Sequence, residues 1–239
     1  VSSSGSEALA SWPTRAAHVV SGGAQLVRLY GGDARIEPDG SASVEWDGAF
    51  SVNFYGGLVP FTITDPELAI DASGAGALTA ELSGCASSQA NPKECAPLAP
   101  ETGVTVATFS GVEVDPAGAV SIAPDYDGVK VDVPAAFASQ SRVVAGWGAW
   151  PQSFVDFHGR TGLASYWYSS GGAFDPYKEP HPFVVDFDGE APPREPAPPV
   201  LGSKPEPPPG GGPEADSGAQ ISAAGRTQAV GRSRLVWVA

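Results

Sequence analysis

Apolar and polar residues alternate along much of the first 134 positions of the chain. This alternation is typical of strands, whose side chains point to opposite faces in turn. In the run AFSVNFY, Phe50, Val52 and Phe54 fall on one face and the residues between them fall on the other. The run LVPFTIT that follows repeats the alternation, with Val59 and Phe61 on one face. The pattern therefore predicts a series of half-buried strands.

Turn residues separate the predicted strands. Asp47-Gly48 lies between two alternating runs and predicts a β-hairpin turn, and Gly56-Gly57 predicts a second turn. No stretch keeps apolar residues at helical spacing over three turns, and the 30 Gly and 24 Pro disfavour helices. Further strands are predicted at residues 25–30, 77–82, 104–114, 119–122, 129–133 and 183–187. We expect an all-β fold, an antiparallel sandwich or a distorted barrel.

Residues 146–178 break this pattern. They hold three of the six Trp and three of the six Tyr in a setting rich in Gly and Ser. Such a composition predicts an irregular segment that caps the core or lines a pocket. Plain packing of the aromatic rings in the core is the simpler interpretation of the same residues.

Composition divides the chain into four parts. Residues 1–10 are expected to be a loose leader and residues 11–189 the β domain. Residues 190–218 form a Pro/Gly-rich linker, because ten of the 24 Pro fall between positions 191 and 213. Residues 219–239 form a basic end with three Arg and no acid, whereas the preceding 218 residues carry a net charge of −17.

The basic end closes with an apolar, strand-like run made of Leu235, Val236, Trp237 and Val238. Two interpretations are open. The run is either the beginning of a further domain, or a tethered strand that adds to an exposed sheet edge of its own chain or of a neighbour.

The net charge of −14 repels phosphate backbones and anionic lipid, so neither nucleic acid nor a membrane surface is an expected partner. Cationic ligands, divalent cations or simple solubility are compatible with it. No apolar run approaches the ~20 residues of a membrane helix, so no membrane insertion is expected. The chain begins at Val1 and lacks Met, so we expect Val1 to be the start of a processed or trimmed chain.

Cys85 and Cys95 lie ten positions apart in a polar stretch. A loop of this length closes readily, and a polar Pro/Ser-rich stretch is an unusual place for two buried thiols, so a disulfide is favoured over free cysteines. A disulfide in turn indicates an extracellular or cell-surface location.

Motifs for catalysis are absent from the sequence. It contains no HExxH, GxSxG or P-loop, and its three His do not share a metal-ligand spacing. We therefore expect neither an enzyme nor a transition-metal site. The acidic turn at Asp125 and Asp127 has some oxygen ligands suited to calcium, but Asp-Gly turns are common for geometric reasons alone.

Four stretches carry a family resemblance: WDGAFSVNFYGGLVPFTITDPEL, GALTAELSG, VTVATFSGVEVD and WGAWPQSFVDFHGRTGLASYWYSSGGAFDPYKEP. Together they resemble the HtaA domain of actinobacterial surface proteins over roughly residues 40 to 188. The resemblance implies an antiparallel β fold outside the cell. It also implies haem as the ligand, held through a tyrosinate that a nearby histidine supports.

The resemblance carries over to particular residues with two departures. Residues 1–45 contain no match to the family's early tyrosine segment, and Tyr55 occupies the position that the family's histidine holds ahead of Asp65-Pro66. Tyr55 is therefore the candidate haem ligand, with His158, Tyr166 or Tyr168 in support.

Two functions from different classes follow. The first is an extracellular HtaA-like binding domain that binds or transfers haem at the cell surface. The second is a structural subunit of a surface fibre or layer, which assembles head to tail by adding its C-terminal strand to a neighbouring copy.

Overall fold

The expected all-β fold is confirmed in a computed structural model that describes residues 26–54, 59–88, 91–187, 220–224 and 233–238. Its strands are β1 Leu26–Ile36, β2 Ala42–Glu45, β3 Ala49–Phe54, β4 Val59–Ile70, β5 Gly76–Ser88, β6 Asn91–Pro97, β7 Glu101–Phe109, β8 Ala119–Ile122, β9 Phe183–Asp186, β10 Gln220–Ala224 and β11 Ser233–Val238. The helical elements are α2 Gln152–Thr161 and two 3₁₀ turns, η1 Ala164–Tyr166 and η2 Asp175–Tyr177.

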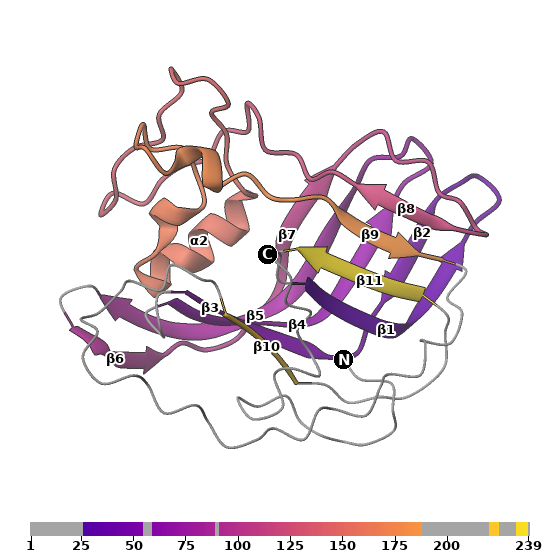
Figure 1. Cartoon of the computed structure of the whole chain (residues 1–239), viewed down its shortest axis with the longest axis horizontal. Helices are drawn as coiled ribbons and strands as arrows, with labels where there is room; N and C mark the ends of the chain where they lie inside the picture. The colour runs from indigo at the N-terminus through magenta and orange to yellow at the C-terminus, as the bar shows by residue number, and fades with distance from the viewer. Residues whose placement is uncertain (1–25, 55–58, 89–90, 188–219, 225–232, 239) are drawn as a thin grey trace, which may run out of the picture.

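All strand pairs are antiparallel and join into one sheet, in the order β10-β3-β4-β2-β1-β11-β9-β8. Strand β5 pairs with β4, β6 and β7, so the sheet continues past β4 on its other side. Among the described residues β7 pairs only with β5 and β8 only with β9, so the sheet does not close into a barrel. It curves so that β7 on one side and β8 and β9 on the other face each other in a sandwich-like arrangement (Figure 1).

The core lies inside this curve. Phe109 of β7 and Phe183 of β9 meet across it, with ring centroids 6.1 Å apart and planes at 72°. Val27 and Leu29 of β1 and Val185 of β9 are almost completely buried in the same cluster. Strands from distant parts of the sequence therefore share one hydrophobic core.

The predicted hairpin at Asp47-Gly48 is wrong, because β2 and β3 do not pair with each other. Both lie along the same side of β4, β3 opposite its first half and β2 opposite its second. Between them the chain crosses a kink in β4: Asp65 has a φ of 45°, and its Oδ1 accepts a hydrogen bond of 2.7 Å from the Gly48 N–H. The Asp65 N–H in turn donates to the Gly48 carbonyl. The paired strands are β3 and β4, which residues 55–58 connect.

The predicted strand at residues 129–133 is also absent. The side-chain oxygen of Gln140 accepts from the Val131 N–H, and its amide nitrogen donates to the Val129 carbonyl. These bonds occupy backbone groups that a neighbouring strand would otherwise use. The strand predicted at residues 104–114 starts earlier and ends at Phe109, whereas the one at residues 119–122 forms as predicted.

The aromatic segment does cap one end of the sheet, but ten of its residues form a helix that the sequence pattern did not predict. Helix α2 follows Pro151 and ends at Gly162, which has the left-handed φ of 87° that glycine accommodates. Its buried residues Phe154, Phe157, His158 and Thr161 follow helical spacing. The helix also covers the edge of β7, since Ser153 Oγ accepts a 3.0 Å hydrogen bond from the Thr105 N–H. The ion pair between Arg160 and Glu101 adds a second link.

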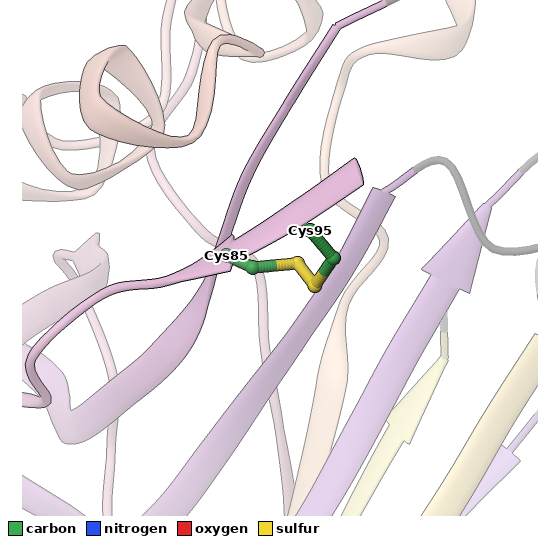
Figure 2. Close-up of a disulfide and its surroundings, with 2 residues drawn as sticks. All are labelled: Cys85 and Cys95. Carbon is green, nitrogen blue, oxygen red and sulfur yellow. A yellow bond between two sulfur atoms is a disulfide. The ribbon is translucent and has the colours of Figure 1, made fainter. Parts of the chain in front are cut away.

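The predicted disulfide between Cys85 and Cys95 is present, with Cα atoms 5.1 Å apart (Figure 2). It joins β5 to β6 beside the pairing of Cys85 with Pro97. A disulfide of this kind is typical of extracellular proteins. In the described part of the chain no helix is long and apolar enough to cross a membrane.

The basic C-terminal end pairs with the sheet of its own chain. Strand β10 lies against β3, and β11 lies between β1 and β9. The predicted docking residues Leu235, Val236, Trp237 and Val238 all fall in β11. The predicted leader, residues 1–10, and the whole of the predicted linker, residues 190–218, lie outside the described residues, as does Tyr55.

The kink at Asp65 yields a stability prediction. Replacing Asp65 with Ala removes the acceptor for the Gly48 N–H and leaves a residue that disfavours positive φ, so we expect a loss of about 1–3 kcal/mol in the free energy of unfolding. Asp65→Asn keeps an acceptor and tolerates this backbone conformation, so its loss should stay below about 1 kcal/mol. Urea unfolding of the three proteins measures both values. Equal stability of Asp65→Ala and wild type would contradict this role of the kink.

Candidate functional site

The aromatic cluster lies where α2 meets the first half of β4. We use this name for the side chains of Phe61, Trp150, Phe154, His158 and Trp167. The ring of Phe61 meets those of His158 and Trp167 edge-on, with centroids 4.6 and 5.7 Å away. Trp150 stacks on Phe154 at 4.9 Å. The cluster therefore joins a strand and a cap that lie about ninety positions apart in the sequence.

His158 is at the centre of this cluster and has no exposed surface. The Thr161 hydroxyl donates to the His158 carbonyl at 2.9 Å, so its oxygen is left to accept from His158 Nδ1 at 3.3 Å. This assigns the proton to Nδ1 and leaves Nε2 as an acceptor without a hydrogen-bond partner. Burial lowers the pKa of His158 to about 3, so the ring is neutral at physiological pH.

The supporting tyrosines differ in their accessibility. Tyr168 is fully buried, and its hydroxyl donates a 2.7 Å hydrogen bond to the Ala138 carbonyl. Burial raises the pKa of Tyr168, which disfavours the tyrosinate form that ferric haem binds. Tyr166 is half-buried, so of His158, Tyr166 and Tyr168 it alone has substantial exposed surface.

The candidate ligand Tyr55 lies outside the described residues. Strand β3, which precedes it in the sequence, pairs with β4, where Val52 is opposite Phe61. The ring of Phe61 contacts His158, so this strand pair reaches the aromatic cluster.

The turn η2 holds a buried ion pair and an exposed aromatic pair that sequence analysis missed. Residues three apart on a 3₁₀ turn lie on one side of it. Asp175 and Lys178 point inward and form an ion pair of 2.8 Å with about a tenth of each side chain exposed. Phe174 and Tyr177 are 75% and 84% exposed. The sequence does contain a signal for this turn. Phe174 and Tyr177 lie three positions apart on either side of a proline, whose ring favours a tight turn.

The inner pair keeps this turn rigid. Burial alone raises the pKa of Asp175, but hydrogen bonds from Lys178 and from the Ser170 and Gly171 N–H groups outweigh it and lower the pKa to about 2. Lys178 Nζ also donates to the Tyr168 carbonyl at 2.9 Å. The exposed aromatic rings are therefore presented on a fixed support rather than on a loose loop.

The acidic turn considered for calcium has a structural role. The Asp125 N–H donates to the Thr108 carbonyl, and Asp127 forms a β-bridge with Gly148. Nowhere in the described ranges do three or more His, Cys, Asp or Glu side chains gather as metal ligands would.

An open groove of about 480 Å³ lies along the loop at residues 131–142 and is lined by Phe137 and Arg142 among others. His158, Tyr166 and Tyr168 do not line it. Its polar groups already bind one another, since Arg142 Nε donates to the Gln140 side chain. The groove is therefore separate from the haem candidates.

Comparison with known proteins gives no relative: no family model, no curated protein and no solved structure matches this chain.

Buried His158 leads to a prediction about pH. Unfolding restores its ordinary pKa near 6.5, so between pH 6.5 and about 3 the unfolded chain binds a proton that the folded chain does not. Acidification through this range should lower the free energy of unfolding by up to about 1.4 kcal/mol per pH unit from this residue.

Urea unfolding at several pH values between 7.5 and 4 measures the effect. The free energy of unfolding of His158→Leu should fall less steeply with acidification than that of wild type, because the unfolded variant has no histidine at this position to bind a proton. His181→Leu, at an exposed position, is the matched control and should fall as wild type does. Identical pH profiles for His158→Leu and wild type would refute the assignment.

Proposed function

We propose that this chain is an extracellular HtaA-like binding domain and that haem is its ligand. The observation that carries the proposal is the aromatic cluster. The sequence stretches that resemble the HtaA domain form separate elements, β3 and β4 in one case and the α2 cap in the other, and they meet at Phe61, Phe154 and His158.

Tyr55 is the iron ligand in this proposal. A phenolate is a hard, anionic ligand that suits ferric haem and releases it on protonation. In the sequence it directly follows β3, whose partner strand β4 contributes Phe61 to the aromatic cluster, and this sequence position supports the proposal. Half-buried Tyr166 is the nearest candidate in the cap for a direct contact, whereas His158 acts from within as a neutral packing group.

The extracellular location rests on two observations. The cysteines form a disulfide, which persists in oxidising compartments. The strong negative charge keeps the domain in solution and away from anionic lipid, as suits a domain that takes up a small ligand outside the cell.

Titration of the full chain with ferric haem tests the proposal. Wild type should give a sharp Soret band with the visible bands of a tyrosinate complex. Tyr55→Phe should lose those bands and bind at least ten-fold more weakly, because it keeps the ring and loses the iron ligand.

Tyr126→Phe is the matched control. Tyr126 is buried, its hydroxyl has no hydrogen-bond partner, and burial together with Asp175, Glu179 and Asp127 raises its pKa to about 12. Removal of the Tyr126 hydroxyl should therefore leave the haem spectrum unchanged. A featureless spectrum for wild type, or an unchanged spectrum for Tyr55→Phe, would overturn haem binding through Tyr55.

A further inference from the structure

Strand β11 fills a position inside the sheet rather than at its edge. Its register with β1 runs from Leu26 opposite Val238 to Gly32 opposite Ser233. On its other side it pairs with β9, from Val184 opposite Val236 to Asp186 opposite Arg234. In the described residues β1 and β9 do not pair with each other, so the last strand of the chain is what connects them.

The position needs an occupant. Val27 and Leu29 on β1, and Phe183 and Val185 on β9, are buried in the core beside it. Without β11, both neighbours would present unpaired backbone N–H and C=O groups next to that core, which is costly. The gap between β1 and β9 is therefore a strand-binding site built into the fold.

The chain that leads to β11 is long. Residues 188–219 lie between β9 and β10 in the sequence, and residues 225–232 lie between β10 and β11. Fully extended, the 32 residues of the first stretch span up to roughly 100 Å. A compact domain of this size is only about 40 Å across, so this stretch is long enough to reach a neighbouring copy when β10 leaves β3 and moves together with β11.

Charge favours the same encounter. The last 21 residues carry three Arg and no acid, whereas the rest of the chain carries −17. Within the sheet, the register sets Arg234 directly opposite Asp186. Opposite charges at such positions stabilise the pairing of two strands, and the overall charges attract the end of one copy to the body of another.

We propose that β11, together with the preceding strand β10, is exchanged between copies of this chain, so that the C-terminal strand of one copy occupies the gap between β1 and β9 of the next. The contacts in the exchanged form are the same as those within one chain. Which form dominates is set by the protein concentration relative to the effective concentration that the tether gives its own strand. That effective concentration falls as the number of residues in the tether increases, so crowding of copies favours exchange. This inference goes beyond haem binding and does not depend on it.

Disulfide trapping in the full chain tests exchange directly. Leu29 and Leu235 are paired in the register, so one copy receives Leu29→Cys and a second, distinguishably tagged copy receives Leu235→Cys. The two are mixed at high concentration, oxidised gently and analysed by non-reducing electrophoresis and native mass spectrometry. We expect a covalent heterodimer whose yield rises at least five-fold between micromolar and near-millimolar protein.

Register provides the matched control. Val238 pairs with Leu26 rather than with Leu29, so Leu29→Cys mixed with Val238→Cys should form little heterodimer under the same conditions. A single copy that carries both Leu29→Cys and Leu235→Cys should form an internal disulfide when dilute. If that copy forms the internal bond while the mixed single variants remain monomeric at every concentration, exchange is overturned. It is equally overturned if the mixed variants crosslink without regard to register.

Haem spectra of the same crosslinked and monomeric samples separate the two proposals. Loss of exchange with an intact Soret band sinks only strand exchange. A featureless spectrum in a sample that crosslinks in register sinks only haem binding.

Discussion

The arrangement of this molecule depends on β4 pairing with two different strands along one side. Its first half pairs with β3 and its second half with β2, and the change occurs at the kink where Asp65 binds the Gly48 N–H. The pairing of β4 with β5 on its other side also shifts register at this point, between Thr64 and Glu67. One half then carries Phe61 toward the cap, and the other carries Leu68 into the main core. The change of partner along β4 therefore lets one strand contribute side chains to the cap and to the main core.

The cap depends in turn on a polar residue inside an apolar setting. His158 packs against four aromatic rings and remains neutral, because nothing near its Nε2 would stabilise a charge. A neutral imidazole fills the space of an aromatic ring while keeping one hydrogen bond to Thr161. The cap therefore combines tight ring packing with a group that titrates only if the packing is lost.

Sequence patterns were sufficient for the fold class, the disulfide and several strands, because alternation and loop length are local properties. They failed where distant residues decide. Residues 129–133 alternate as a strand does, yet the Gln140 side chain forms hydrogen bonds with the backbone groups that a neighbouring strand would use. Asp47-Gly48 has the composition of a hairpin turn, yet its partner is Asp65 on a strand that comes later. Helix α2 was missed because it is under three turns long and its inward-facing His158 reads as polar. For the candidate site, the sequence did not indicate that Tyr168 and His158 are buried, because their burial depends on how the cap packs against distant strands.

The hydrogen bond from the Thr105 N–H to Ser153 Oγ has a consequence for how copies of this protein meet in a crowded environment. Sheets with bare edges stack indiscriminately and seed aggregates, so natural proteins blunt them. Here a helix from the cap blunts the edge of β7 with one hydroxyl group and one ion pair. A serine on the first turn of α2 thus occupies a backbone donor that another strand would need in order to add to this edge.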